Sequence, residues 1–426
     1  MNLKVENRNP WFYVPTTYFA EGLPYMIVNF LAVVIYKRMG VSNTDIAFWT
    51  SLLYLPWVIK MFWGPIVDIY STKRNWILYT QIIMAFALLL CGFSLQVKGF
   101  LLASTCFFML IAFISATQDI AIDGYYMLSM DESKQAFFVG IRAFFWRMGM
   151  IFTTGALVFL AGYLEKSTGN IPLSWTITLC ISGVIFLILF LYHKFILPYP
   201  KTETVKKEKL DWHGFSDVFI SYFNRKGILI MIAFILIYRF GEAMLVKLTA
   251  PFLLDTIAKG GLGLETTQVG WIYGTVGVLA LIVGGVLGGV IIAKYGLKRC
   301  IWPMALLLNL PDLVYVYMSI HQTLAHYWVY ILIGTEQFGY GLGTTAFMFY
   351  LIEISGKKYK TSYFAISTGI MALGMMLPGM VSGYFQEHVG YTTFFLAAFC
   401  FSMPGMLLIP FLGLKAHISH KVEQSL

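Results

Sequence analysis

Charged side chains lie inside long apolar stretches of this sequence, where such groups are costly. An ionised group in the middle of a membrane costs about 3 kcal/mol or more unless it is paired or hydrated, so each one is a candidate for chemistry. Asp119 and Asp123 are one helical turn apart, so both carboxylates lie on the same face of a helix. A carboxylate in such a place can change its protonation when a neighbouring cation moves. These groups can therefore couple a movement of helices to the binding of protons.

We expect two kinds of site among these residues. The acidic side chains are candidate proton carriers. The basic side chains and one amide are candidate contacts for an anionic substrate, because a guanidinium group can hold a carboxylate through two hydrogen bonds. The proton-carrier candidates are Glu21, Asp119, Asp123, Glu242 and Glu336, and the substrate-contact candidates are Lys60, Gln118, Arg147, Arg239 and Lys247.

Depth along the helices predicts which charges meet. A helix rises about 1.5 Å per residue, so residues on neighbouring antiparallel helices can be placed at equal depth. The pairs at equal depth are Asp119 with Arg147, Asp123 with Arg142, and Glu336 with Lys247. The alternative interpretation is that these pairs are static and only join helices.

The overall composition requires a membrane. Hydrophobic residues make up 58% of the 426 residues and charged residues 12%, with a mean hydropathy of +0.73, which leaves too little polar surface for a soluble protein of this size. A bilayer crossing needs roughly 20 mostly apolar residues, and such stretches recur along nearly the whole chain. The sequence predicts an all-α polytopic membrane protein with twelve transmembrane helices at 12–36, 45–67, 76–96, 100–128, 137–163, 172–197, 228–254, 267–293, 300–319, 327–353, 364–388 and 391–413.

Basic residues predict the orientation. Most Lys and Arg of the short loops fall on the side that carries both termini, so both termini are expected in the cytoplasm. The net charge of +9 then follows from this topology and from contact with anionic membrane lipid, and it requires no nucleic-acid partner. The first span contains Glu21 and Pro24 without a small-residue cleavage pattern, so we expect it to stay in the protein.

A long polar segment divides the chain into two similar parts. We predict an N-terminal six-helix bundle at 1–197, a cytoplasmic linker at 198–227 and a C-terminal six-helix bundle at 228–426. A pattern of glycine, aspartate and paired basic residues follows the second span and recurs in degraded form after the eighth. We expect the two copies to form a gate, since glycine lets helices approach closely and a charged group can pair across the interface. The alternative is that the basic loops only set the topology. The gate candidates are Gly64, Asp68, Lys73, Arg74, Gly289, Lys298 and Arg299.

This repeated loop pattern resembles the signature of the major facilitator superfamily. The resemblance implies two pseudo-symmetric six-helix bundles whose first, fourth, seventh and tenth spans line a central cavity. Most of the candidate charges fall on these four spans.

Several stretches are similar to the AmpG-type permeases within that superfamily. This resemblance implies a proton-coupled carrier in the inner membrane of a bacterium that imports anhydromuropeptides, the disaccharide peptides released in cell-wall turnover. The similar stretches are GLPYMIV (22–28), IKMFWGPIVD (59–68), SATQDIAID (115–123), RMGM (147–150), IYRFGEA (237–243), GLGTTAF (341–347) and, as the most specific, FAISTGIMALG…PGMVSGYFQEHVGYTTFFL (364–396).

Other functions lack support in the sequence. We find no HExxH or GxSxG motif, no metal-ligand spacing of Cys or His and no ATP-binding loop, which argues against an enzyme and against an ATP-driven pump. We expect a monomer without metal or cofactor. Two alternatives remain: a carrier of a sugar, an oligosaccharide or another anionic metabolite, and a membrane sensor that binds its ligand without transporting it.

Overall fold

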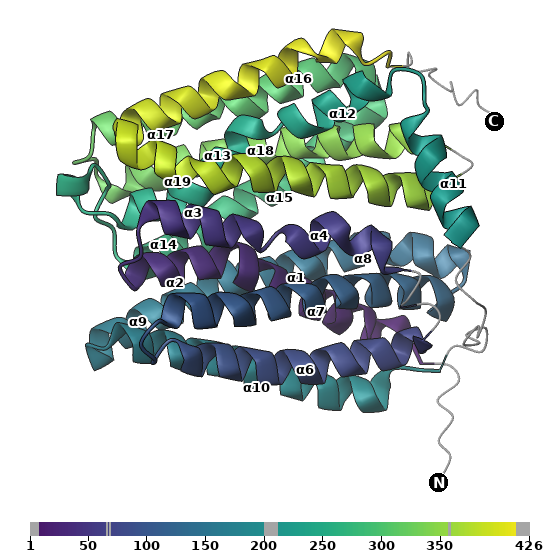
Figure 1. The fold of residues 1–426 in the computed structure, drawn as a ribbon, viewed down its shortest axis with the longest axis horizontal. Helices are drawn as coiled ribbons and strands as arrows, with labels where there is room; N and C mark the ends of the chain where they lie inside the picture. Colours follow the sequence, from purple (N-terminus) through teal and green to yellow (C-terminus); the bar gives the residue numbers. More distant parts are fainter. Residues whose placement is uncertain (1–7, 65–66, 68–69, 200–211, 357–358, 415–426) are drawn as a thin grey trace, which may run out of the picture.

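The computed structural model describes residues 8–64, 67, 70–199, 212–356 and 359–414, and within these ranges the chain forms helices and no strand. Figure 1 shows two stacked groups of helices, purple to blue for the first half of the sequence and teal to yellow for the second. The first described segment, 8–12, and the last, 409–414, lie at the same end of the helices, which we call the terminal end. The opposite end, with loops 39–42, 95–99, 255–265 and 321–325, is called the far end.

The first half contains six crossings. Several of them are built from consecutive short helices, because Pro24 and two wider (π-helical) turns, at Ile27–Leu31 and Phe152–Leu157, interrupt the regular hydrogen bonding. The helices of this half are η1 (Pro10–Phe12), α1 (Val14–Met26), η2 (Ile27–Leu31), α2 (Ala32–Arg38), α3 (Asn43–Leu52), α4 (Leu55–Ile59), η3 (Lys60–Phe62), α6 (Lys73–Ser94), α7 (Phe100–Ser129), α8 (Glu132–Ile151), η4 (Phe152–Leu157), α9 (Val158–Thr168) and α10 (Ile171–Ile196).

The second half repeats this arrangement after a short helix, α11 (Trp212–Phe223). Its other helices are α12 (Ile228–Ile237), α13 (Phe240–Leu254), η5 (Ile257–Lys259), α14 (Thr266–Trp271), η6 (Ile272–Gly277), α15 (Val278–Tyr295), α16 (Leu297–Asn309), η7 (Leu310–Asp312), α17 (Leu313–Ile320), α18 (His326–Ile354), α19 (Lys360–Leu407) and η8 (Ile409–Phe411).

Within the described residues, nine helical segments are long and apolar enough to cross a membrane. One of them, Ser362–Phe411, leaves the helical conformation at Gly390 (φ +76°) and turns back there, so it supplies two crossings. The predicted crossings at 45–67 and 327–353 are not among the nine, because the first is broken into short helices and the middle of α18 (GTEQFGYGLGTT, 334–345) is rich in polar residues and glycine. The predicted all-α polytopic fold is confirmed, whereas the exact limits of the two bundles stay a prediction.

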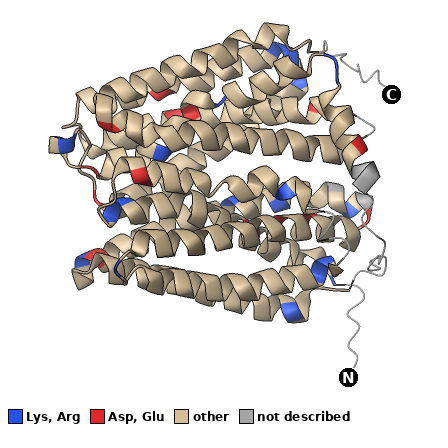
Figure 2. Cartoon of the chain, viewed as in Figure 1, with Lys and Arg blue, Asp and Glu red and all other residues tan. Residues whose placement is uncertain are grey.

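The surface of the helices suits lipid. Figure 2 shows that charged residues are sparse along the helices and that most of the chain is uncharged. Large apolar side chains such as Phe86 (58% exposed) and Leu229 (79% exposed) point outward. Such side chains are stable in contact with lipid tails, so the exposed face is the face that a membrane covers.

The two halves are joined at the far end by polar contacts. Lys37 Nζ lies 2.7 Å from the carboxylate of Asp255, and Asn43 Nδ2 donates a hydrogen bond of 2.7 Å to Gln386 Oε1. In each contact one residue belongs to the first half and the other to the second. The far end is therefore closed by bonds that must break if the halves separate there.

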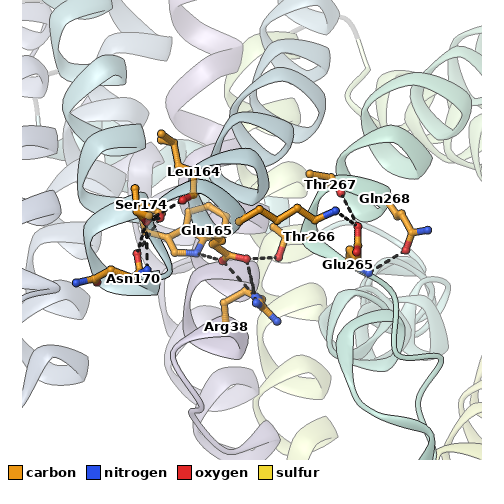
Figure 3. Close-up of polar contacts among 12 residues, drawn as sticks. Arg38, Leu164, Glu165, Asn170, Ser174, Glu265, Thr266, Thr267 and Gln268 are labelled. Carbon is orange, nitrogen blue, oxygen red and sulfur yellow. Dashed lines mark hydrogen bonds and ion pairs between the residues drawn. The ribbon is translucent and has the colours of Figure 1, made fainter.

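Glu165 is the centre of a second far-end network, drawn in Figure 3. Its carboxylate accepts hydrogen bonds from Arg38 Nε (3.1 Å), from Trp175 Nε1 (2.9 Å) and from Thr266 Oγ1 (2.8 Å), and it forms an ion pair with Arg38 Nη2 at 2.9 Å. Arg38 and Trp175 lie in the first half, but Thr266 is the first residue of α14 in the second half. Because the Glu165 side chain is only 7% exposed, these bonds form in a partly desolvated site, where they are stronger than in water.

A solvated ion pair lies beside this network. Lys166 Nζ is 2.5 Å from Glu265, and both side chains are more than half exposed. The hydrogen bond from Lys166 holds the pKa of the Glu265 carboxyl below its usual value. The pair is therefore charged at neutral pH, and its contribution is lost only as the pH falls through that lowered pKa. At this exposure its contribution is small.

The backbones of the two halves touch where η4 crosses η6. A Cβ atom built on Gly274 would lie 1.9 Å from the Cα atom of Gly155, so neither helix can carry a side chain at this point. Both glycines fall in wider helical turns at matching places in the fifth and eighth crossings. The crossing is thus a direct backbone contact between the halves.

We predict that Glu165→Gln opens the far end. The substitution removes the charge that holds Arg38 and Thr266, and hydrogen bonds to charged groups contribute about 1.5–3 kcal/mol each. The balance between closed and open far ends should shift about tenfold, which corresponds to about 1.4 kcal/mol. Spin labels on cysteines placed at exposed Lys98 and Thr323, one in each half, would report the distance across this end.

Glu265→Gln is the matched control, because it removes a neighbouring carboxylate whose pair is solvated. It should change the distance distribution little, since exposed pairs contribute about 0–1 kcal/mol. An equal response of both variants would contradict the importance assigned to the Glu165 network.

Candidate functional site

A cavity of about 1240 Å³ lies between the two halves. Its wall runs from Thr249 and Tyr315 in the interior to Lys73, Leu128 and Ser362, which are close to helix ends at the terminal end. With the far end closed, the cavity extends toward the terminal end. The lining residues that carry the argument below are Glu21, Tyr25, Trp57, Lys60, Asp119, Asp123, Arg142, Trp146, Arg147, Arg239, Glu336, Gln337, Tyr340 and Thr344.

The two aspartates of α7 are both paired within the first half. Asp119 lies 2.5 Å from Lys60 Nζ, which η3 brings to the cavity. Asp123 accepts hydrogen bonds from Tyr18 Oη (2.8 Å) and from Arg142 Nη1 (3.1 Å). The predicted Asp123–Arg142 pair is therefore confirmed.

The predicted pair of Asp119 with Arg147 does not form. Lys60 takes the place beside Asp119, while α8 directs Arg147 toward the second half. Arg147 Nη2 lies 3.1 Å from the position that a Cβ atom of Gly285 would occupy, so that glycine leaves the space for the guanidinium group. Arg147 makes no ion pair or hydrogen bond with any of the described residues. It is a cavity cation whose donors are free for a ligand.

Glu21 lies deep in the cavity wall, 8% exposed, and its Oε2 has no hydrogen-bond partner among the described residues. The position is fixed by tight packing of α1 on α8, since a Cβ atom on Gly22 would lie 2.3 Å from the backbone oxygen of Trp146. Its carboxyl group interacts electrostatically with Asp119 and Lys60. Glu21 is thus a buried carboxyl group next to an ion pair, as a proton carrier requires.

Arg239 and Glu242 form a closed pair in the second half. Arg239 lies in the break between α12 and α13, and its Nε and Nη2 donate to the two oxygens of Glu242 at 2.8 and 2.6 Å. Arg239 Nη2 also donates to Tyr340 Oη at 2.7 Å. Because the guanidinium fork already holds a carboxylate, Arg239 is less available to an anionic ligand than Arg147.

Glu336 is buried without a cation beside it in the described part of the chain. It is 3% exposed, and its Oε2 accepts hydrogen bonds from Tyr315 Oη and Gln337 Nε2, each at 3.0 Å. The expected partner Lys247 instead donates to Thr50 of the first half. The predicted Glu336–Lys247 pair therefore does not form.

Asp312 is a buried carboxyl group that the sequence reasoning missed. It is 2% exposed, its Oδ2 has no hydrogen-bond partner among the described residues, and it interacts electrostatically with Glu336 and Glu242. It ends η7, the short helix that Pro311 starts inside the predicted span 300–319. An acidic residue beside a proline within an apolar span was the available signal.

Two predicted substrate contacts lie outside the cavity wall. Gln118 is fully buried and its Nε2 donates to Ala20 O at 3.0 Å, so it joins α7 to α1. Lys247 is 1% exposed and lies between the halves on the far-end side of the cavity. The structure gives neither residue access to a ligand in the cavity.

The two gate segments differ in their contacts. Asp68 lies outside the described residues. Arg74 is buried and donates to the backbone oxygens of Leu197 and Lys194, which ties the start of α6 to the end of α10. Lys298 and Arg299 at the start of α16 are exposed.

The other gate candidates are small or buried. Lys73 is buried and its stem packs over Gly124, whereas Gly64 and Gly289 have open space where a side chain would be. The gate role of these residues stays a prediction.

These features define a class of protein: two helical halves in a membrane, closed against each other at one end, with a charged cavity between them. The sequence profile described as Major Facilitator Superfamily matches residues 16–335. The chain belongs to the Major Facilitator Superfamily, and it is a secondary transporter rather than an enzyme.

Individual relatives agree with this assignment. The chain is 28% identical over 400 residues to the anhydromuropeptide permease of Escherichia coli K12, covering 92% of this chain and 77% of the relative. It is 25% identical over 417 residues to the putative transporter AmpG 4 of Rickettsia conorii, covering 93% of this chain and 95% of the relative. The fold is similar to the crystal structure of a mutant of the nucleoside transporter NupG, with a TM-score of 0.71 at 16% identity, covering 97% of this chain and 100% of that one.

We predict that Lys60→Met destabilises the protein because it leaves the Asp119 carboxylate without its cation. The loss of a charged hydrogen bond costs about 1.5–3 kcal/mol. The double variant Lys60→Met/Asp119→Asn should regain most of that stability, as measured by thermal unfolding in detergent. Lys134→Met is the control, because its pair with Asp131 is more than half exposed at the surface, and its effect should stay within about 0.5 kcal/mol. A double variant no more stable than Lys60→Met contradicts the pairing.

Proposed function

We propose that this chain imports anhydromuropeptides together with protons, by alternating access, across the inner membrane of a bacterium. The observation that carries the proposal is the combination of a large cavity with the unpaired cation Arg147. Similarity to the permeases above supports the choice of substrate. Both termini are then cytoplasmic, and the cavity described here faces the cytoplasm.

The size and chemistry of the cavity suit a sugar joined to a peptide. Pockets for small ligands usually measure about 300–1,000 Å³, and this cavity is larger. Tyr25 packs edge-on against Trp57 (5.1 Å between ring centroids) and in a tilted arrangement against Trp146 (5.7 Å). These aromatic faces can stack on a sugar ring, while Arg147 can hold a carboxylate of the peptide.

Polar groups without partners add to this match. Asn29 Oδ1 and Thr344 Oγ1 belong to lining residues, and neither has a hydrogen-bond partner among the described residues. Both oxygens are buried in the wall, and a rotation of either side chain would present its oxygen to the hydroxyl and amide groups of a glycopeptide. A simple sugar or another anionic metabolite would use fewer of these contacts, so it is the second candidate.

The proton would be carried by buried carboxyl groups. Glu21 and Glu336 line the cavity, and neither has a Lys or Arg within ion-pair distance among the described residues. Burying an ionised carboxylate without a partner is costly, so each favours binding a proton when water is excluded. Asp119, Asp123 and Glu242 differ from them, because each is already paired with a cation. No metal or cofactor has a part in this proposal, and a monomer is sufficient for it.

We predict that uptake of labelled anhydromuropeptide into proteoliposomes follows an imposed proton gradient. A protonophore should abolish accumulation and leave exchange intact. Unlabelled anhydromuropeptide should compete, whereas simple sugars and acetyl-CoA should not. Accumulation that follows sodium and ignores the protonophore would refute proton coupling. Competition by a simple sugar alone would favour the second candidate, and saturable binding without accumulation would indicate a sensor.

We predict that Arg147→Lys raises the KM for anhydromuropeptide about tenfold, the effect of losing one charged hydrogen bond of about 1.4 kcal/mol. The variant should still reach the membrane and elute as a single species. Arg142→Lys is the matched control on the same helix, because Asp123 and Tyr18 already bind Arg142, and its KM should change much less. Asp119→Asn should not rescue Arg147→Gln, since Asp119 pairs with Lys60; rescue would show that Arg147 is a static partner instead of a substrate contact.

A further inference from the structure

Lys247 is a lysine of the second half that is buried against the first half. It lies on α13, and its side chain is 1% exposed. Its Nζ lies 3.0 Å from the backbone oxygen of Thr50 and 3.3 Å from Thr50 Oγ1, both on α3. This contact therefore crosses the interface that closes the far end.

The surroundings of Lys247 contain no negative charge among the described residues. From the first half, Thr50 and Ser51 of α3 and the ring of Tyr54 face it, with Nζ 4.7 Å from the ring centroid. From α19, Gly379 faces it, and the missing side chain leaves room for the lysine stem, because a Cβ atom there would lie 3.3 Å from Lys247 Cγ.

The nearest carboxylates along its own helix are already bound. Glu242 is held by Arg239, and Asp255, just after the helix, is held by Lys37. Tyr54 is thus the titratable group that faces Lys247.

The acceptors around Nζ match a neutral amine. A neutral amine has two N–H donors, and Thr50 offers two acceptors, its backbone oxygen and its hydroxyl oxygen. The hydroxyl hydrogen of Thr50 is directed to Ile46 O at 2.7 Å, which leaves the oxygen lone pairs free. An ammonium group has a third N–H; among the described residues it finds no third acceptor, and the Tyr54 ring is the nearby group with negative character. A ring face attracts a cation, but it replaces neither water nor a carboxylate around a fully buried charge.

Separation of the halves at the far end would reverse this situation. Lys247 and Thr50 belong to different halves, so opening that end removes the two acceptors and admits water. A hydrated lysine is protonated at neutral pH. The charge state of Lys247 is thereby linked to whether the far end is open or closed.

We propose that Lys247 is a proton-binding site of the transport cycle, charged while the far end is open and neutral while it is closed. On closure, one N–H bond of the ammonium group breaks, the electron pair stays on Nζ and the proton passes to water in the narrowing gap. This inference rests on the proposed proton-coupled transport, and it adds a basic residue to the carboxyl groups named there. It also assigns Lys247 to the proton instead of the substrate.

The test uses the full-length protein in lipid nanodiscs without substrate. Spin labels at Lys98 and Thr323 report the fraction of molecules with an open far end between about pH 6 and pH 9. In the otherwise unaltered protein, that fraction should rise at least threefold on acidification. Lys247→Met should remain closed over the whole range, because it has no group to protonate. Lys247→Arg should be open over the whole range, since arginine stays charged.

Lys259→Met is the matched control. It removes an exposed lysine of the neighbouring far-end loop, so it should keep the full pH response. The exposed histidines of this end, His321, His326 and His388, are present in every variant, and any response they cause is common to all.

A Lys247→Met variant with an unchanged pH response overturns the inference, and so does a Lys247→Arg variant that closes like the unaltered protein. If Lys247→Met fails to fold, the Lys247→Arg comparison decides. These outcomes can be distinguished from a failure of the proposed function. The function is refuted if the unaltered protein shows no proton-driven uptake of anhydromuropeptide. The spin-label distances, which are measured without substrate, test only the role of Lys247.

Discussion

The cost of an uncompensated charge in an apolar interior governs the arrangement of this protein. Lys60 with Asp119, Arg142 with Asp123, and Arg239 with Glu242 each place both partners in the same half. In the described residues, the polar side-chain contacts that cross between the halves, such as Lys37 with Asp255 and Glu165 with Thr266, gather toward the far end. One half can therefore move against the other without leaving its central charges unpaired, and only the far-end contacts have to be exchanged for water.

This division also explains where a ligand can act. The paired charges already satisfy one another, so a substrate gains little by competing for them. Arg147 is different, because it lines the cavity and the described residues offer it no hydrogen-bond or ion-pair partner. Asn29 Oδ1 and Thr344 Oγ1 also lack partners among the described residues, but both are buried in the wall and reach a ligand only if their side chains turn. A ligand that supplies those partners binds both walls, since Arg147 and Asn29 belong to the first half and Thr344 to the second.

The sequence predicted what depends on composition and on one-dimensional spacing. Apolar stretches of membrane-crossing length identified the helices, and depth along neighbouring helices identified the Asp123–Arg142 pair. The pair of Asp119 with Arg147 was predicted wrongly, because depth in the membrane does not specify how a helix is rotated about its own axis. The rotation of the helices directs Arg147 away from Asp119 and places Lys60 beside it. The partner of Lys247 was predicted wrongly for the same reason, because its side chain points to Thr50 across the interface and not to Glu336. Asp312 was overlooked because its span reads as apolar, and only the fold shows that it lies near Glu336.

The contact of Gly155 with Gly274 has a mechanical consequence. Where side chains interlock, two helices can turn against each other only by changing rotamers or leaving voids, which resists motion in small steps. Here two bare backbones meet inside wider helical turns, so no side chains interlock at this point and the two backbones can turn against each other. This crossing can therefore act as a pivot that keeps the two halves in contact. A small rotation about it produces displacements that grow with distance along the helices, so the largest displacements fall at the two ends.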